Sequence, residues 1–220
     1  FPADSLIAVN LEEWKADPNG ARKTLVWAPA ERQTKQGGSI TANSLFVSML
    51  DNVVGKVVRF NFEDGAWRQS EVALPGNATV GIAASSDASD QIMFTVSDFL
   101  NPTTLYYSDG GEPEPIKTSP AYFDPSGREV EQRQATSADG TKIPYFIVKP
   151  AGMAMNGSTP TLLTGYGGFQ VPRLPAYLAS TGKLWLENGG AYVLGNMRGG
   201  GEFGPKWHQG AIRENKQRTW

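Results

Sequence analysis

Residues 161–169, TLLTGYGGF, decide how the C-terminal part of the chain folds. A short apolar strand over 161–164 leads directly into a glycine-rich loop. Residues 176–188 then have the pattern of a helix that ends at Gly189-Gly190, and residues 191–194 form a second apolar strand. The succession of strand, helix and strand predicts a parallel sheet covered by helices.

The pattern differs upstream of about residue 128. Residues 129–136 and 141–149 flank the turn Ala138-Asp139-Gly140, which is a strong hairpin signal. Before them the chain shows short strands and turns without convincing helical periodicity. A weak repeat of paired strands, at 46–60 and 93–107, predicts the blades of a β-propeller, with a β-sandwich as the alternative.

The division between the two parts is predicted from composition. Four prolines between residues 113 and 125 indicate a linker, so we expect one domain over residues 1–121 and a second over 122–220. Residues 1–120 carry 9 Lys and Arg against 15 Asp and Glu, whereas residues 121–220 carry 11 against 7. Opposite net charges suit two domains that face each other.

Composition excludes several functions. The chain has 220 residues, of which 40% are hydrophobic, so it can form a packed core. Its net charge of −2 gives little support to a nucleic-acid partner, and the lack of 18 consecutive apolar residues predicts no membrane-spanning helix. Without cysteine there is no thiolate nucleophile or thiolate zinc site, and one histidine limits metal and acid–base schemes. We therefore expect neither a metal nor a cofactor.

The two ends suggest a piece of a longer protein. Residue 1 is Phe and no signal peptide is recognisable. The chain stops at Trp220, inside a predicted helix over 212–220 that has no terminating signal.

One motif has the form of a dinucleotide-binding fingerprint. Residues 199–204, GGGEFG, match G-x-G-x-x-G after a predicted strand. The fingerprint belongs to the first strand of its unit, however, and here a strand and a helix precede it. Phe203 and Pro205 also fit poorly with a phosphate cradle, so we interpret the glycines as a sharp turn at a strand end.

The loop GYGGF at 165–169 is a better candidate for chemistry. Ligands bind at the carboxyl ends of strands in open α/β sheets, and in α/β-hydrolases a loop after an early strand supplies oxyanion-hole donors. The Tyr166 hydroxyl suits a developing oxyanion. The alternative is a glycine-rich turn with a buried tyrosine.

His208 is the second candidate. A single histidine is more often structural than catalytic, and the chain contains no G-x-S-x-G nucleophile elbow to pair with it. We therefore favour a structural role for His208.

Several motifs in order give the chain a resemblance to the prolyl oligopeptidase family of serine peptidases. They cover roughly residues 136–220, and residues 1–120 resemble the last propeller blades of that family more weakly. The motifs are SADGTKIP at 137–144, GYGGF at 165–169, NMRGGGEFG at 196–204, WHQG at 207–210 and NKQ at 215–217.

The resemblance implies an all-β propeller segment followed by the N-terminal part of an α/β-hydrolase domain. It implies a serine endopeptidase that cleaves short peptides after proline, in which Tyr166 donates to the oxyanion and Phe169 lines the proline-binding S1 pocket. The catalytic Ser, Asp and His of the family lie beyond the segment that matches Trp220. The triad is therefore absent from this chain, and we expect the chain alone to be inactive.

Other interpretations stay open. The chain could belong to a related oligopeptidase of other specificity, or to a non-catalytic, propeller-bearing binding module. Short proline-containing peptides are the expected partners, with no nucleic acid and no membrane. The sequence leaves the compartment open between cytoplasm and periplasm.

Overall fold

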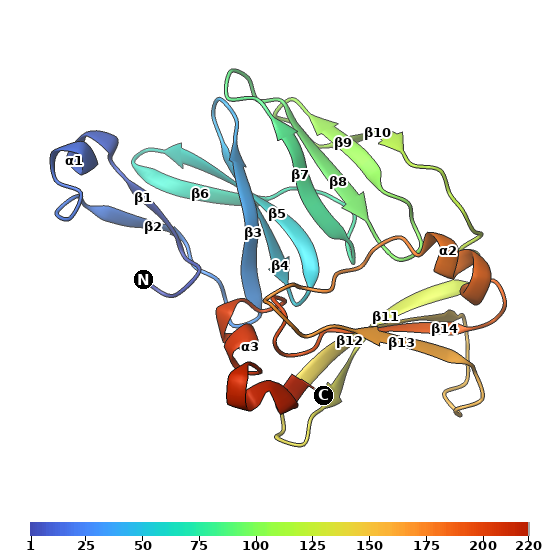
Figure 1. The fold of residues 1–220 in the computed structure, drawn as a ribbon. Coiled ribbons are helices and arrows are strands. Elements are labelled where there is room, and N and C mark those ends of the chain that lie inside the picture. Colours follow the sequence, from blue (N-terminus) through green and yellow to red (C-terminus); the bar gives the residue numbers. More distant parts are fainter. Residues whose placement is uncertain (220) are drawn as a thin grey trace.

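The computed structural model describes residues 1–219, and its strands form four separate sheets (Figure 1). A two-stranded hairpin is followed by two four-stranded antiparallel sheets and then by a four-stranded mixed sheet. The strands of the first three sheets are β1 (Leu6–Val9), β2 (Lys23–Trp27), β3 (Gln33–Ile40), β4 (Leu45–Asp51), β5 (Val54–Glu63), β6 (Ala66–Glu71), β7 (Thr79–Ser85), β8 (Ile92–Ser97), β9 (Thr104–Ser108) and β10 (Glu114–Thr118).

The two antiparallel sheets are stacked meanders. Within each sheet the strands lie in chain order, as in propeller blades. Successive side chains of β4 point to opposite faces. Phe46 joins the core of the β7–β10 sheet, where its ring centroid lies 6.0 Å from that of Phe94, whereas Val47 packs in a cluster with Trp27 of β2. The β3–β6 sheet is thus covered on both faces, which agrees with the predicted succession of blades.

Two N-terminal details differ from the prediction. A helix, α1 (Leu11–Ala16), lies between β1 and β2, where no helix was expected. It forms because the Asn10 side chain accepts hydrogen bonds from the backbone N–H groups of Glu12 and Glu13, and it is too short to show periodicity. Gly37-Gly38, a pair of residues typical of turns, lies inside β3, where a register shift accommodates it as an irregularity in the ladder.

The predicted linker also contains a strand. β10 pairs with β9 at the exposed edge of its sheet. Pro115 is tolerated there because an edge strand pairs on one side only, and the register shifts between Pro115 and Lys117. The irregular connection therefore begins only after Thr118.

The C-terminal sheet is mixed rather than wholly parallel. Its strands lie in the order β11-β12-β14-β13, and only β13 and β14 are parallel. β11 and β12 form the long hairpin that the turn at 138–140 predicted. The bounds are β11 (Arg128–Thr136), β12 (Lys142–Pro150), β13 (Thr161–Gly165) and β14 (Ala191–Gly195).

The helix predicted over residues 176–188 is much shorter. Regular structure begins with α2 (Ala179–Thr181) and continues as a π-helical turn, η1 (Gly182–Leu186). The chain is not helical before this point because the N–H of Leu178 donates to the carbonyl of Phe99 at 3.1 Å, outside any helix. A widened turn follows, in which the N–H of Glu187 donates to Gly182 at 3.0 Å.

The last elements are also short. α3 (Pro205–Gln209) begins with proline, and η2 (Arg213–Thr219) is a 3₁₀ helix rather than the α-helix expected over 212–220. Trp220 lies outside the described residues. Helical cover of the mixed sheet is therefore sparse within residues 1–219.

One hydrophobic cluster joins the β-rich N-terminal part to the mixed sheet. Phe99, from the loop after β8, is 1% exposed, and its ring centroid lies 5.4 Å from Phe146 of β12 and 6.1 Å from Tyr192 of β14. Val53, at the tip of the β4–β5 hairpin, is buried in the same cluster. The two parts thus share a core, and the mixed sheet has a fixed position beneath the hairpin tips (Figure 1).

Candidate functional site

Two glycine-rich loops leave the mixed sheet on the same side, at the carboxyl ends of β13 and β14. β13 and β14 run parallel, and Gly165 and Gly195 are register partners at their C-terminal ends. The loop GYGGF follows the first and NMRGGGEFG follows the second. The topology therefore brings these two predicted motifs together at the carboxyl ends of the parallel pair β13 and β14.

The side chain of Tyr166 is accessible at this edge. It is 43% exposed, and within residues 1–219 its hydroxyl makes no hydrogen bond. A Cβ added to Gly168 would lie 3.5 Å from the tyrosine ring, at ordinary van der Waals distance, so the ring lies close beside this part of the backbone. The alternative of a buried tyrosine does not describe this residue, since its O–H can donate to a group in the solvent-filled space.

Phe169 extends from the same loop into solvent. Its side chain is 85% exposed, and both Phe169 and Gln170 adopt left-handed backbone conformations, with φ of 52° and 58°. The N–H of Val171 closes the turn by donating to the carbonyl of Gly168 at 3.0 Å. Backbone strain of this kind clusters at active sites and ligand-binding segments.

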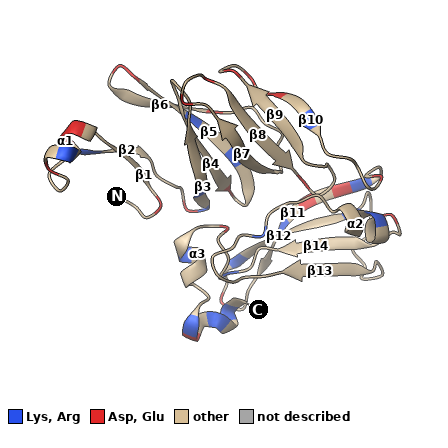
Figure 2. Ribbon diagram, turned by 45° about the horizontal axis from the view of Figure 1, so that its top comes forward, with Lys and Arg blue, Asp and Glu red and all other residues tan. Residues whose placement is uncertain are grey.

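The two loops are in direct contact. Gly199 has φ of 94°, and a Cβ on it would overlap the carbonyl oxygen of Gly167. A Cβ on Gly167, φ 65°, would overlap the side chain of Thr219. The ammonium of Lys216 donates to the same Gly167 carbonyl at 2.6 Å. The backbone next to Tyr166 is therefore held by the second loop and by η2, where basic residues gather near the C-terminus (Figure 2).

A buried arginine, Arg198, connects the loop after β14 to the β11–β12 hairpin. The Arg198 guanidinium forms an ion pair with Asp139 and donates to the hydroxyls of Ser137 at 2.8 Å and Thr141 at 3.2 Å. The hydrogen bond from Arg198, followed by those from Thr141, holds the pKa of the Asp139 carboxyl far below its ordinary value. The motif SADGTKIP is thus connected to NMRGGGEFG through side chains.

Beneath the loops lie two buried polar side chains. Glu202 and Asn196 are both 0% exposed. Glu202 Oε1 accepts from the N–H of Arg173 at 2.9 Å, and Asn196 Nδ2 donates to the carbonyl of Arg173 at 2.6 Å. Burial raises the pKa of the Glu202 carboxyl. Neither residue could be identified as a candidate from the sequence, because both bind a residue more than 20 positions away.

His208 has a local partner. Its Nδ1 lies 2.7 Å from the carbonyl oxygen of Gly199 and 3.1 Å from the backbone N of Gln170, so it donates to Gly199 when protonated and accepts from the Gln170 N–H when it is not. The Gly199 carbonyl also accepts from the N–H of Gln170 at 3.1 Å. The contact helps to close the glycine loop, as expected for a structural histidine. The interpretation of 199–204 as a turn also fits, since the Glu202 carboxylate fills the space beside Gly200 that an anionic phosphate would need.

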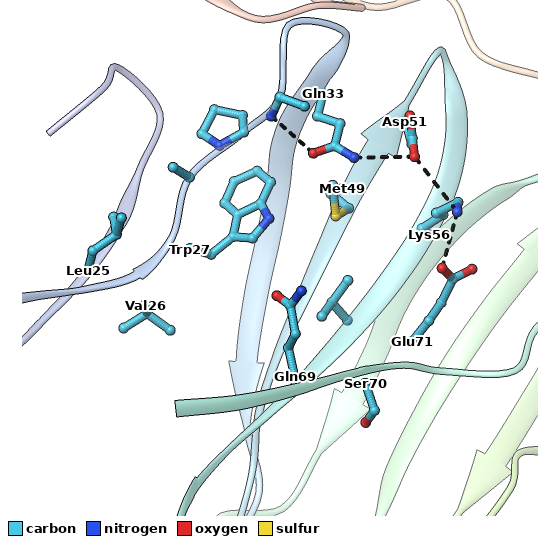
Figure 3. Close-up of a pocket in the computed structure, with 14 residues that line it drawn as sticks. Leu25, Val26, Trp27, Gln33, Met49, Asp51, Lys56, Gln69, Ser70 and Glu71 are labelled. Atoms are coloured by element: carbon cyan, nitrogen blue, oxygen red, sulfur yellow. Dashed lines mark hydrogen bonds and ion pairs between the residues drawn. The ribbon is translucent and has the colours of Figure 1, made fainter. Parts of the chain in front are cut away.

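A separate hollow of about 630 Å³ lies between β2 and the β3–β6 sheet (Figure 3). Trp27 and Met49 form its apolar wall. Lys56 forms ion pairs at 3.7 Å with Asp51 and at 3.1 Å with Glu71 across it. None of its lining residues belongs to the loops after β13 and β14. It is therefore distinct from the candidate site.

Residues 1–219 contain neither a metal-binding cluster of side chains nor a helix suited to span a membrane. No group of three or more His, Asp or Glu side chains is arranged to hold a metal ion in this part of the chain. Over the same residues, no helix has the length and apolar character needed to cross a bilayer.

Comparisons with known proteins agree with this architecture. Residues 1–119 match the family described as prolyl oligopeptidase, N-terminal beta-propeller domain. An uncharacterized peptidase, y4nA, from Sinorhizobium fredii is 44% identical over 222 residues, covering 100% of this chain and 31% of the relative. A prolyl endopeptidase from Elizabethkingia miricola is 36% identical over 152 residues, covering 68% of this chain and 21% of the relative.

A solved structure is similar over nearly the whole chain. The post-proline cleaving enzyme from Rickettsia typhi superimposes with a TM-score of 0.87 at 34% identity, covering 99% of this chain and 32% of that protein. The chain thus spans about a third of the length of its full-length relatives, or less. The propeller match over more than half of the chain, together with the relatives named as prolyl endopeptidases, leads to one conclusion: the chain belongs to the prolyl oligopeptidase family.

Proposed function

We propose that this chain is part of a serine endopeptidase that cleaves short peptides after proline. In this proposal residues 1–121 are the C-terminal blades of the propeller and residues 122–220 begin an α/β-hydrolase peptidase domain. The whole enzyme would carry out the cleavage, because residues 1–220 contain no G-x-S-x-G nucleophile elbow.

Strand topology supports the hydrolase assignment. GYGGF follows β13, the third strand of the mixed sheet along the chain, and in α/β-hydrolases the loop after the third strand supplies an oxyanion-hole donor. β13 lies at the edge of the sheet within residues 1–219, and the side chains of Leu162 and Leu163 are exposed there. A further parallel strand beside β13 would end next to Tyr166. A nucleophilic serine at the end of that strand would then face the tyrosine hydroxyl.

The role proposed for Tyr166 is stabilisation of negative charge. In acyl transfer the serine Oγ adds to the substrate carbonyl carbon while a histidine takes the serine proton, and the carbonyl oxygen becomes an oxyanion. The Tyr166 O–H and one backbone N–H would donate to that oxygen. The histidine then protonates the departing amine, and water releases the acyl group by the same steps. We do not assign this role to His208, because in α/β-hydrolases the histidine follows the nucleophile along the chain, and no nucleophile elbow precedes His208 in residues 1–220.

Phe169 is proposed to select proline. An apolar ring that is exposed at the same edge as Tyr166 can contact the flat pyrrolidine ring of a proline at P1, the residue before the scissile bond. A basic P1 side chain would gain little binding energy from such a ring and would favour a pocket that contains carboxylates. The exposed position of Phe169, three residues after a tyrosine whose hydroxyl has no hydrogen-bond partner within residues 1–219, is the observation that carries this proposal.

The test uses the full-length protein and three reporter peptides that differ only at P1. We expect the highest kcat/KM with proline, a lower value with alanine and the lowest with arginine, together with covalent labelling by a fluorophosphonate that is specific for active serines. A preference for arginine would instead indicate a related oligopeptidase. Absence of both cleavage and labelling would indicate a non-catalytic binding module.

A further inference from the structure

Within residues 1–219, the position of the Phe169 ring is set by the backbone rather than by side-chain packing. The ring is 85% exposed there, so few of these residues surround it. Phe169 and the following Gln170 both have positive φ, and neither is a glycine. Consecutive left-handed residues are strained, and they persist only where the surrounding structure fixes them. The contacts that hold this segment therefore determine where the ring stands.

The segment after Phe169, residues 170–175, which we call the strap, is held at Gln170, at Arg173 and at Pro175, whose carbonyl accepts from the Thr79 hydroxyl at 2.6 Å. At its start the N–H of Gln170 donates to the carbonyl of Gly199 at 3.1 Å. Three residues later both peptide groups of Arg173 are held by side chains. The Arg173 N–H donates to Glu202 Oε1 at 2.9 Å, and its carbonyl accepts from Asn196 Nδ2 at 2.6 Å.

The strap lies directly on the loop that bears Glu202. A Cβ on Gly201 would overlap the carbonyl of Gln170, so only glycine allows this approach. The strap thus has backbone contact at Gly199 and Gly201 and side-chain contact at Arg173. Only three residues separate Arg173 from Phe169, so a displacement of the Arg173 backbone would also displace the strained turn at Phe169.

The two holding side chains are unusual residues for a buried position. Glu202 and Asn196 are 0% exposed, and within residues 1–219 neither Glu202 Oε2 nor Asn196 Oδ1 has a hydrogen-bond partner. Burying polar atoms without partners is unfavourable, and apolar side chains of similar volume would often be more stable there. A carboxylate and an amide at this place suit an orienting role better than a stabilising one.

We propose that Glu202 and Asn196 are positioning residues for substrate specificity. By holding the Arg173 peptide they fix the strap, and the strap fixes the Phe169 ring against which the P1 proline packs. Neither residue touches the substrate. This inference rests on the proposed function, because it names what sets the proline preference of the same site.

The test compares four variants of the full-length enzyme. Glu202→Met and Asn196→Leu remove the two hydrogen bonds while keeping similar volume. Glu202→Gln keeps an acceptor for the Arg173 N–H, and its amide can also donate to Asn196 Oδ1. Glu214→Met, on the exposed side of η2, is the matched control for the change of glutamate to methionine.

The readout is the ratio of kcat/KM for reporters with proline and alanine at P1. We expect the ratio to fall at least tenfold in Glu202→Met and in Asn196→Leu, and to stay within threefold of wild type in Glu202→Gln and Glu214→Met. A merely structural role would reduce both substrates alike. An unchanged ratio in a folded Glu202→Met or Asn196→Leu enzyme would overturn the proposal.

A double variant tests whether Glu202 acts through Phe169. In a Phe169→Ala background the ring is gone, so adding Glu202→Met should leave the proline-to-alanine ratio unchanged. A further tenfold fall in that background would show that Glu202 affects specificity by another route, and would contradict the proposal. Should Glu202→Met not fold, Glu202→Asp replaces it, because it withdraws the carboxylate by one methylene group.

Hydrogen exchange separates this inference from the proposed function. In the wild-type enzyme the strap amides should be protected, and Glu202→Met should accelerate exchange over residues 168–175 but not over β11. If wild type shows no proline preference, the proposed function fails, yet the exchange result still tests whether Glu202 holds the strap. Equal exchange of the strap in wild type and Glu202→Met would refute this positioning role of Glu202.

Discussion

Gly165 of β13 and Gly195 of β14 are register partners, so the loops that carry Tyr166 and Arg198 leave the mixed sheet side by side. The contact continues beyond the sheet, because Gly199 lies against the Gly167 carbonyl and leaves no space there for a side chain. The conformation next to the candidate oxyanion donor therefore depends on a loop about 30 residues further along the chain.

The first prediction concerns this glycine contact. Gly199→Ala should lower the free energy of unfolding by about 1–2 kcal/mol for the left-handed backbone and by roughly a further 1–3 kcal/mol for the overlap with Gly167. Gly189→Ala is the matched control, because Gly189 also has positive φ, 84°, but has open space around it. Urea unfolding of the full-length protein measures both. Equal destabilisation by the two variants would mean that the Gly199 contact has no energetic weight.

A second prediction follows from the ion pair between Arg198 and Asp139. The folded protein holds the pKa of Asp139 below its ordinary value of 3.8. The unfolded chain therefore binds its proton first as pH falls, and the stabilisation from this group is complete above pH 3.8 and declines below it.

Asp139→Asn removes that dependence. The difference in Tm between wild type and Asp139→Asn should favour wild type at pH 6 and shrink steadily between about pH 4 and pH 2. Thermal unfolding across this range provides the measurement, with Asp87→Asn as a control at a carboxylate for which the structure gives no ion pair within residues 1–219. A Tm difference that stays constant with pH would contradict the assignment.

A third prediction addresses specificity. Phe169→Ala should reduce kcat/KM for a P1-proline reporter by about 10–200-fold, the range for losing apolar contact in a specificity pocket. The P1-alanine reporter should lose much less, because its methyl group touches little of the ring. Phe62→Ala removes another exposed phenylalanine, on β5, and should change neither substrate. Equal losses on proline and alanine would remove Phe169 from the specificity pocket.

Much of the strand pattern was predictable, because local composition dictates it. The strands near residues 44–49, 56–62 and 91–96 are rich in β-branched and aromatic residues, and turn residues separate them. The edge strand β10 was not predictable, since its prolines are typical of loops and only its position at a sheet edge tolerates them.

The prediction of a helix over 176–188 was wrong for a similar reason. Its apolar residues serve a tertiary contact, in which the N–H of Leu178 donates to Phe99 in place of a helical partner. Periodicity cannot reveal a competing bond to a residue 79 positions away.

The residues of the candidate site likewise fall into those that the sequence indicated and those that only the structure revealed. The GYGGF loop is contiguous, so Tyr166 and Phe169 could be named as candidates from the sequence, and their roles remain predictions. Glu202 and Asn196 could not, because their partner Arg173 is brought to them only by the fold. Contiguous motifs are readable from the sequence, whereas positioning contacts require the structure.

The most direct test of the account is kcat for Tyr166→Phe in the full-length enzyme, measured with a P1-proline reporter. The phenylalanine ring keeps the shape of the loop and removes only the hydroxyl. Because losing one oxyanion donor costs on the order of 10²–10³ in rate, we predict a fall of that size in kcat with little change in KM. A variant with wild-type kcat would show that the Tyr166 hydroxyl does not stabilise the transition state.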